Sequence, residues 1–293
     1  MHTPQADIHT DAELVARLVE EQHPDLAGPL RLVSDGWDNQ LYRLGDELVV
    51  RVPRREVAAH LIEHEQHVLP GIAARVPVAV PAPVRVGVPS NTFPWPWSIV
   101  QWIDGIDGAD VSAGERASLA RPLAEFLAAL HIPAPADAPR NPVRGGPLAD
   151  RDAAVRERLR HLSDRMEVAA LADVWRKALD APLWTGPAMW LHGDPHPGNL
   201  LLTRDRSGLA AVIDFGDVTS GDPATDLATA WLTFEPAARN EFRSRLEELT
   251  PIDPATWMRA QGWAVAMASA LAAHSDDNPR MRGLATHALA QLA

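Results

Sequence analysis

The stretch Trp190–Leu201, which reads WLHGDPHPGNLL, and the later run Ile213–Gly216, which reads IDFG, decide the fold prediction for this chain. Two short apolar runs, 199–203 and 208–213, connect these motifs and flank a polar turn. Apolar runs on either side of such a turn are typical of a β-hairpin. A hairpin brings its two ends together, so we expect the two motifs to become neighbours.

The polar side chains at the hairpin ends suit the handling of phosphate. Asp194 and Asn199 form a His-x-Asp-x-x-x-x-Asn loop, in which the Asp orients a substrate hydroxyl and the Asn turns toward a metal ion. Asp214 follows the second apolar run. Mg²⁺ prefers oxygen ligands and takes few of them from protein, so an Asn amide and an Asp carboxylate are suitable. The spacing indicates phosphoryl transfer from a magnesium–nucleotide complex.

Both motifs resemble those of the aminoglycoside phosphotransferase family, which shares a protein-kinase-like fold with the choline kinases. The later run 221–228, GDPATDLA, is similar to the Asp-Pro-x-x-Asp-Leu-Ala helix start of that family. Asp222 there suits an N-cap, with Pro223 at the first helical position. The resemblance implies roles for five residues: Asp194 as the catalytic base, Asn199 and Asp214 as the metal ligands, and His192 and Asp226 as braces of the loop.

Each motif taken alone has a simpler interpretation, namely a hairpin with polar ends. His-Gly-Asp triplets arise by chance, and most of them lie in turns. The three motifs occur here in order and at hairpin spacing, which favours the kinase interpretation. A nucleotide-binding pseudokinase is the alternative from another functional class. The presence of Asp194, Asn199 and Asp214 argues against it.

Composition indicates a folded protein and restricts its partners. The chain has 293 residues, 46% of them hydrophobic and 23% charged, and it has no cysteine. It has no apolar run long enough to cross a bilayer and no signal-peptide pattern at its start, so we expect a cytoplasmic protein without a membrane partner. The net charge of −12 argues against a nucleic-acid partner and permits a cationic substrate. The oligomeric state stays open.

The N-terminal third is expected to form a nucleotide site on an antiparallel meander. A helical stripe occupies 11–21, and three short strands follow at 29–34, 40–44 and 47–52. The turn at Gly36, between the first two strands, could present backbone N–H groups to nucleotide phosphates. It lacks the Gly-x-Gly-x-x-Gly pattern of protein kinases, so without the later motifs it would be an ordinary hairpin turn.

The third strand is where a kinase-like fold places a phosphate-binding lysine. The single lysine of the chain, Lys177, lies far downstream, so the matching cation is Arg51. The kinase interpretation also requires a carboxylate from the helix predicted at 55–73 to pair with this cation. Glu65 is our choice and Glu63 the alternative. The stripe formed by His60, His64 and His67 on this helix is more typical of a solvated face than of a zinc site.

A last strand, 97–103, leads to the Asp104-Gly105 pair, a passage that fits a hinge between two lobes. In such folds the adenine edge bonds to the hinge backbone. Gln101, Trp102 and Ile103 are therefore candidate nucleotide contacts by position. We expect a nucleotide-binding lobe at 1–103 and a catalytic and substrate-binding lobe at 104–293.

The rest of the chain is mainly helical. Expected helices lie at 119–131, 151–165, 171–179, 223–234, 236–249, 254–274 and 280–292, and a strand at 188–191 leads into the loop of Asp194. A long Pro/Ala/Gly-rich loop at 133–147 is expected to border the substrate site.

We therefore expect an α+β, two-lobed, protein-kinase-like fold with a small N-terminal antiparallel sheet and a larger, mainly helical C-terminal lobe. The expected activity is transfer of the γ-phosphoryl group of ATP or GTP, with Mg²⁺, to a hydroxyl of a small molecule. By resemblance the acceptor is an antibiotic, an aminoglycoside first and a macrolide second. A metabolic kinase for choline, homoserine or a sugar amine stays open, because the acceptor pocket is not part of the shared motif.

Overall fold

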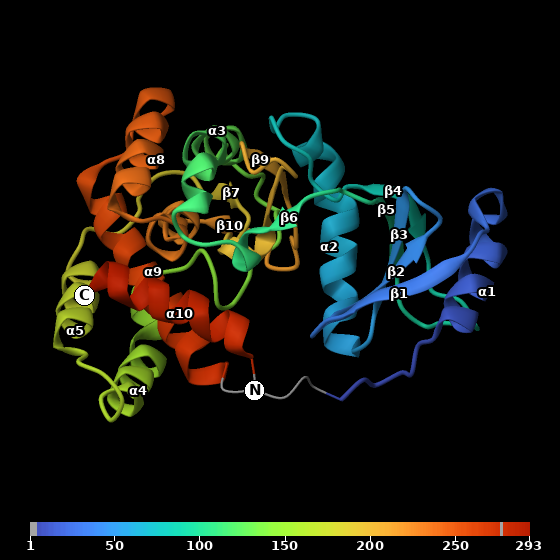
Figure 1. Cartoon of the computed structure of the whole chain (residues 1–293), viewed down its shortest axis with the longest axis horizontal. Helices are drawn as coiled ribbons and strands as arrows, with labels where there is room; N and C mark the ends of the chain where they lie inside the picture. The colour runs from blue at the N-terminus through green and yellow to red at the C-terminus, as the bar shows by residue number, and fades with distance from the viewer. Residues whose placement is uncertain (1–4, 276–277) are drawn as a thin grey trace. The chain divides into compact units, whose positions relative to one another are not determined.

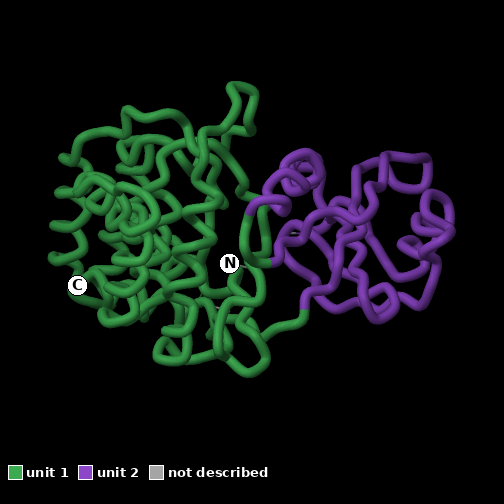
Figure 2. Tube along the Cα trace, turned by 90° about the horizontal axis from the view of Figure 1, so that it is seen from above, with its two compact units in different colours: residues 1, 76–78, 104–293 green, residues 2–75, 79–103 purple. Residues whose placement is uncertain are grey.

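The computed structural model describes residues 5–275 and 278–293. Within them the chain forms two compact units (Figure 2). The smaller unit comprises 5–75 and 79–103, and the larger unit comprises 76–78, 104–275 and 278–293.

The smaller unit is built on a five-stranded antiparallel sheet, which confirms the predicted meander and also contains the strand predicted at 97–103. The strands follow the order β1-β2-β3-β5-β4. They are β1 (Leu30–Asp35), β2 (Asn39–Leu44), β3 (Leu48–Pro53), β4 (Pro83–Gly87) and β5 (Trp97–Gln101). Helices α1 (Ala12–Gln22) and α2 (Glu56–Ala73) lie on opposite sides of this sheet (Figure 1).

Alternation along β3 divides its side chains between these two helices. Val50 and Val52 join a buried cluster with Leu18 of α1. The residues between and before them, Val49 and Arg51, are also buried and must point to the other face, because successive side chains of a strand alternate. The α2 side of the sheet therefore carries a buried arginine.

The larger unit is mainly helical, with two small sheets. Its helices are α3 (Ala120–Leu130), α4 (Asp152–Leu162), α5 (Ala169–Leu179), α6 (Ala224–Leu227), α7 (Thr229–Thr233), α8 (Pro236–Leu249), α9 (Pro254–His274) and α10 (Pro279–Leu292). One antiparallel sheet has the order β6 (Ile106–Asp107), β8 (Leu200–Leu202) and β9 (Leu209–Val212). The other pairs β7 (Met189–Leu191) with β10 (Thr219–Gly221).

Helix α9 is the centre of the larger unit. It packs against α4, α5, α6, α7 and α10. Its apolar side chains are distributed all around the axis, which is typical of a helix covered on every side. Asp253 caps its start by accepting a hydrogen bond of 2.9 Å from the Thr256 N–H, and Pro254 occupies the first helical position.

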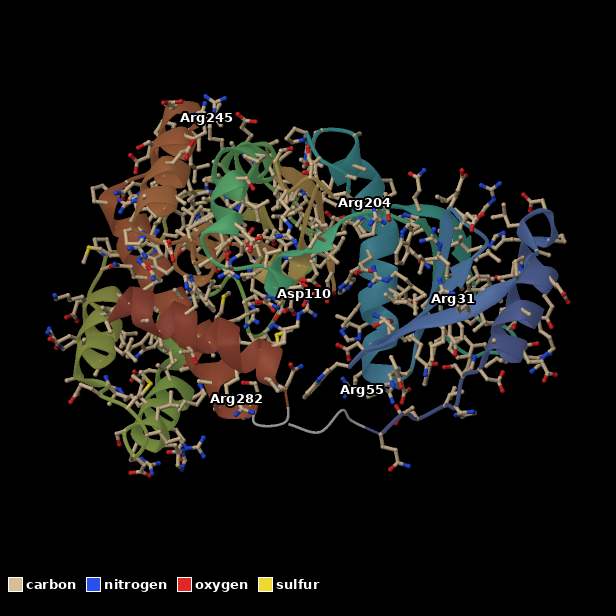
Figure 3. The ribbon with its side chains drawn as sticks, in the orientation of Figure 1. Arg31, Arg55, Asp110, Arg204, Arg245 and Arg282 are labelled. Atoms are coloured by element: carbon tan, nitrogen blue, oxygen red, sulfur yellow. The ribbon has the colours of Figure 1, made fainter. Side chains whose placement is uncertain are left out.

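Ion pairs between helices lie on the surface of this unit. Arg245, at the outer end of α8, donates to Glu125 of α3 at 3.0 Å (Figure 3). Exposed pairs of this kind contribute at most about 1 kcal/mol, so the packing of α3 against α8 rests on their apolar faces. None of the helices in 5–275 and 278–293 combines the length and the apolar character that crossing a bilayer requires.

The segment predicted as one helix at 223–234 forms two short helices, α6 and α7, so that prediction is wrong in detail. The Trp231 N–H donates to the Ala228 carbonyl, a bond from residue i+3 to residue i that interrupts the regular α-helical pattern. Helix α6 also begins after Pro223 rather than at it. Asp222 still acts as a cap, because its Oδ1 accepts a hydrogen bond of 3.0 Å from the Ala224 N–H.

Candidate active site

The hairpin predicted from the sequence is present in the larger unit. Strands β8 and β9 pair antiparallel, with Leu200 opposite Val212. The next residues continue the pairing, since the Ile213 N–H donates to the Asn199 carbonyl at 2.9 Å. Asn199 and Asp214 therefore lie at the same open end of the hairpin.

Asp214 has an unusual backbone conformation. Its φ is +61°, in the left-handed region, which Asp adopts more readily than most residues. The side chain is exposed, and its Oδ1 accepts a long hydrogen bond of 3.4 Å from the Gly216 N–H. Non-glycine residues in this region are concentrated at functional sites. The conformation presents a solvent-accessible carboxylate at the end of the hairpin.

The loop between Leu191 and the hairpin is held by its own polar side chains. The Asn199 Nδ2 donates to the Asp194 carbonyl at 2.9 Å, which leaves the amide oxygen directed away from that bond. The His192 ring connects the loop to the other end of the hairpin. Its Nδ1 accepts from the Asp194 N–H at 3.2 Å, and its Nε2 donates to the Ile213 carbonyl at 2.9 Å.

The carboxylate of Asp226, in α6, binds the backbone of the same loop. It is fully buried, and its two carboxylate oxygens accept from the N–H groups of His192 and Gly193, each at 2.8 Å. His131, which follows α3, adds a third contact, with its Nε2 3.0 Å from the Asp226 carboxylate. Three segments of the chain are thus joined at one carboxyl group.

The Asp194 carboxylate lies near the side chains of Arg144 and His196. The Arg144 Nη2 lies 3.5 Å from one oxygen, and the His196 Nε2 lies 3.9 Å from the other. Burial by itself raises the pKa of the Asp194 carboxyl. Arg144, followed by His196 and His192, outweighs burial, so this pKa lies below its ordinary value. Asp194 is therefore an ionised carboxylate at neutral pH.

Asp217 lies on the other side of the same guanidinium. Its Oδ2 is 3.6 Å from the Arg144 Nε, and its Oδ1 accepts from the Asn141 Nδ2 at 2.7 Å. Burial raises the pKa of the Asp217 carboxyl, and the carboxylate of Asp194 raises it further, while Arg144 and Asn141 only partly oppose this. The carboxyl groups of Asp194 and Asp217 therefore differ in acidity.

Gly193 is required by the geometry of the loop. Its φ is +93°, and a Cβ built there would lie 2.3 Å from the Asp217 carbonyl oxygen. Gly193→Ala is expected to lower the free energy of unfolding by about 1–3 kcal/mol, because alanine is strained at this φ and the backbone must move. Urea unfolding measures the change. Gly208→Ala is the matched control, since its Cβ would meet no atom within 4 Å. Equal stability of the two variants would contradict the expectation.

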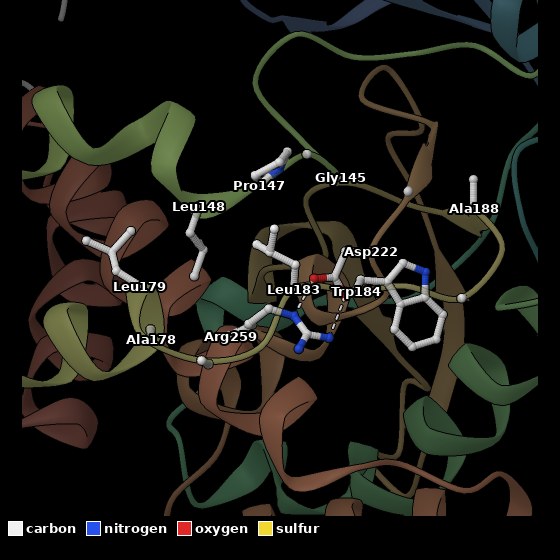
Figure 4. Close-up of a pocket in the computed structure, with 14 residues that line it drawn as sticks. Gly145, Pro147, Leu148, Ala178, Leu179, Leu183, Trp184, Ala188, Asp222 and Arg259 are labelled. Carbon is white, nitrogen blue, oxygen red and sulfur yellow. Dashed lines mark hydrogen bonds and ion pairs between the residues drawn. The ribbon is translucent and has the colours of Figure 1, made fainter.

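A buried ion pair fixes the start of α6. The Arg259 Nε of α9 donates to the Asp222 Oδ2 at 2.6 Å, and its Nη1 donates to the Pro182 carbonyl at 2.6 Å. Figure 4 shows this pair at the wall of a cavity of about 210 Å³ with mainly apolar neighbours, among them Leu148 and Trp184. Arg259 and Asp222 neutralise each other. The pair anchors the start of α6 and thereby the position of Asp226.

In the smaller unit, two of the predicted nucleotide residues come together. The Arg51 Nη2 of β3 donates to the Glu65 Oε1 of α2 at 3.0 Å, and both side chains are buried. This pairing is the one that the kinase interpretation requires of the strand cation. Glu63 does not take this position, because the partner in the structure is Glu65.

The Gly36 turn is also in this unit, and its own amide is occupied. The Gly36 N–H donates to the Asn39 carbonyl at 3.0 Å, and the Gly36 carbonyl accepts from the Arg54 Nη1 at 2.8 Å. Any contact of this turn with phosphate must therefore use other groups of the turn. Arg55 additionally pairs with Asp38, which fixes the turn against the start of α2.

The predicted hinge residues follow directly from β5. Gln101 is the last residue of the strand, and the Trp102 N–H donates to the Glu47 carbonyl at 2.7 Å. The Arg43 guanidinium lies over the Trp102 ring, 4.0 Å from its centre. A base bound here would use the remaining backbone groups of the segment, such as those of Ile103.

Several residues of the site were missed by the sequence prediction. Arg144 and Asn141 come from the 133–147 loop, which was expected to border the substrate site but offered no motif. His131 is the last residue of the helix predicted at 119–131, for which no role in the site was predicted. Asp217 had a signal, because it directly follows the Asp214 turn and carries the same charge.

The comparisons with known proteins agree with this geometry. Residues 29–263 match the APH family, described as the phosphotransferase enzyme family. A five-stranded antiparallel sheet followed by a helical unit is the protein-kinase-like fold, which confirms the predicted fold class. The chain belongs to this family of phosphotransferases.

Solved structures of similar fold include aminoglycoside and macrolide phosphotransferases. The GDP complex of wild-type aminoglycoside 2'-phosphotransferase-IIIa is 18% identical over 96% of this chain and 98% of that chain, with a TM-score of 0.69. Macrolide 2'-phosphotransferase MphH from Brachybacterium faecium is 22% identical over 94% and 98%, with a TM-score of 0.63. At these identities the likeness establishes the fold.

Proposed function

We propose that this phosphotransferase moves the γ-phosphoryl group of ATP or GTP to a hydroxyl of a small-molecule antibiotic, with an aminoglycoside as the first candidate. The observation that carries the proposal is the joint arrangement of Asp194, Asn199 and Asp214 at one end of a hairpin. These are a base for a hydroxyl and two oxygen donors for a metal ion.

Asp194 would act on the acceptor. Its low pKa makes it a weak base, so it accepts a hydrogen bond from the hydroxyl and takes the proton late, as the new bond forms. The acceptor oxygen bonds to the γ-phosphorus, and the bond from that phosphorus to the bridging oxygen of the nucleoside diphosphate breaks. Catalysis of this kind depends mainly on position and electrostatics.

Asn199 and Asp214 would hold Mg²⁺. Their donors, an amide oxygen and an exposed carboxylate at the same hairpin end, are of the type that Mg²⁺ prefers. In the described part of the chain, no group of three or more His, Cys, Asp or Glu side chains could hold a metal ion. A divalent ion here would complete its coordination with water and phosphate oxygens. When bound, Mg²⁺ supplies positive charge that offsets the charge of the phosphates.

Arg51 and Glu65 would serve the nucleotide. A buried guanidinium fixed by a carboxylate suits bidentate contact with phosphate oxygens, a geometry that differs from that of lysine. The turn around Gly36, through groups other than the Gly36 amide, is a further candidate for phosphate contact. The segment formed by Gln101, Trp102 and Ile103 is the candidate for base contact. ATP and GTP stay as alternatives, because backbone groups rather than a side chain would distinguish them.

The acceptor is the second part of the proposal. An aminoglycoside is the first candidate because the motifs resemble those of aminoglycoside phosphotransferases, and the net charge of −12 permits such a cationic acceptor. A macrolide is the second candidate, supported by the similar fold of macrolide 2'-phosphotransferases, one of them 20% identical over 99% of both chains with a TM-score of 0.62. Choline, homoserine and sugar amines test the metabolic alternative.

The deciding experiment measures nucleotide consumption with Mg²⁺ in the presence of aminoglycosides, macrolides and small alcohols, using ATP and GTP in turn. We expect consumption that depends on one class of acceptor, with a phosphorylated product of matching mass. Binding of Mg²⁺–nucleotide without turnover for any acceptor would instead support the pseudokinase alternative. Absence of nucleotide binding would refute both.

A further inference from the structure

Arg144 places a positive charge between two carboxylates of the site. Its Nη2 lies 3.5 Å from the Asp194 Oδ1, and its Nε lies 3.6 Å from the Asp217 Oδ2. Strong hydrogen bonds between a guanidinium and a carboxylate have lengths of about 2.7–2.9 Å. The guanidinium is therefore near both carboxylates and tightly bonded to neither.

Arg144 has unused hydrogen-bonding capacity. Its Nε is buried and has no hydrogen-bond partner within 5–275 and 278–293. The side chain is only 21% exposed, so solvent has limited access to it. A buried N–H without a partner carries a desolvation cost, which a ligand with several acceptor oxygens would remove. A phosphoryl group is such a ligand.

The backbone on both sides of Arg144 is fixed, so the side chain extends from a defined position in the loop. The next residue, Gly145, donates its N–H to the Thr225 Oγ1 at 3.2 Å and accepts from the Asp222 N–H at 2.9 Å. Earlier in the loop, the Asn141 N–H donates to the Thr219 Oγ1 at 2.8 Å. Both sides of Arg144 are thus tied to the segment that follows the Asp214 turn. Sites that act by position need this kind of support.

On the basis of the proposed function, we infer that Arg144 is a catalytic residue that contacts the transferred phosphoryl group and offsets its charge while the acceptor oxygen attacks. The attack takes place beside Asp194, and a cation 3.5 Å from that carboxylate can reach the group under attack. Arg144 stays protonated throughout. The hydroxyl proton passes to Asp194, and the electrons of the breaking P–O bond leave with the nucleoside diphosphate.

The alternative is that Arg144 acts only on the neighbouring carboxylates of the free protein and does not contact the phosphoryl group. In that case Arg144 would only neutralise Asp194 and Asp217, and any effect of its removal would act through these carboxylates. A double-mutant cycle distinguishes the two roles, because a residue that acts only through Asp194 has no further effect once Asp194 is replaced.

The test measures binding of an analogue of the transferred group, which needs no acceptor. Calorimetry gives the affinity of the unchanged protein for Mg·ADP and Mg·GDP, with and without aluminium fluoride. Aluminium fluoride occupies the place of the phosphoryl group beside a nucleoside diphosphate. We expect it to tighten binding at least about tenfold, since it mimics a charge distribution that the site is built to hold.

Arg144→Ala is expected to abolish this tightening or to reduce it at least about tenfold, while the affinity for the diphosphate alone stays within about twofold. Arg144→Lys should restore part of it, because lysine keeps the charge without the bidentate geometry. Arg140→Ala, an exposed arginine of the same loop, is the matched control and should behave as the unchanged protein. The loss of tightening caused by Arg144→Ala should persist in an Asp194→Asn background.

Other outcomes would overturn the inference. The inference fails if aluminium fluoride tightens binding equally in the unchanged protein and in Arg144→Ala, or if it does not tighten binding in the unchanged protein. It also fails if the loss of tightening caused by Arg144→Ala disappears in the Asp194→Asn background. If Arg144→Ala fails to fold, as judged by circular dichroism, Arg144→Lys and Arg144→Gln carry the same comparison. If the unchanged protein binds neither Mg·ADP nor Mg·GDP, the proposed function itself is refuted, a result distinct from these.

Discussion

Asp194→Ala is expected to lower kcat for phosphoryl transfer by about 10²–10⁴-fold, with little change in the Kd for the Mg²⁺–nucleotide complex. The physical reason is that Asp194 orients the acceptor hydroxyl and takes its proton, whereas the nucleotide is held by other groups. The measurement is steady-state transfer to the acceptor identified by the panel, together with calorimetric nucleotide binding. Retained turnover would refute the assignment of Asp194 as the base.

Two further variants separate chemistry from folding in this experiment. Asp194→Asn keeps the size of the side chain but lacks the second acceptor oxygen and the charge. It should therefore lose nearly as much activity as Asp194→Ala. Asp173→Ala removes an exposed carboxylate of α5 and should leave transfer unchanged. The unfolding midpoints of all three proteins should be similar, because Asp194 is partly exposed and its removal leaves Arg144 beside Asp217.

The hairpin and the loop could be predicted because their determinants are local. Polar turn residues between two apolar runs specify a hairpin, and β8 and β9 pair as that pattern requires. Antiparallel pairing then places Asn199 and Asp214 at one end without further information. The pairing of Arg51 with Glu65 was predicted on a different basis, the resemblance to kinase-like folds, in which a strand cation pairs with a carboxylate of the following helix.

The contacts that were missed depend on packing between distant segments. Arg144 reaches Asp194 only because its loop is bonded to Thr219, Asp222 and Thr225, and nothing in the composition of that loop indicates those bonds. His131 reaches Asp226 through the packing of α3 in the same way. The Gly36 amide is a different case, because the bond that occupies it is local: its N–H donates to the Asn39 carbonyl within the same turn.

Asp226→Ala is expected to have the largest effect on stability, lowering the free energy of unfolding by about 3–6 kcal/mol. The carboxylate accepts from two buried backbone N–H groups, of His192 and Gly193, and contacts the His131 ring. Each buried donor left without a partner costs about 1–3 kcal/mol, and alanine supplies no acceptor for any of them. Urea unfolding, with the m-value checked for two-state behaviour, measures the loss.

Activity and stability should fall together for this residue, unlike for Asp194, because Asp226 acts by holding the loop rather than by touching the reacting atoms. Asp226→Asn should be intermediate, since its amide offers one acceptor oxygen but directs an NH₂ group toward donors of the loop. Asp137→Ala, an exposed carboxylate of the 133–147 loop, should change the free energy of unfolding by less than about 0.5 kcal/mol. A fully stable Asp226→Ala protein would mean that the loop keeps its geometry without this carboxylate. The position of Asp194 would then have to be explained by His192 and Asn199 alone.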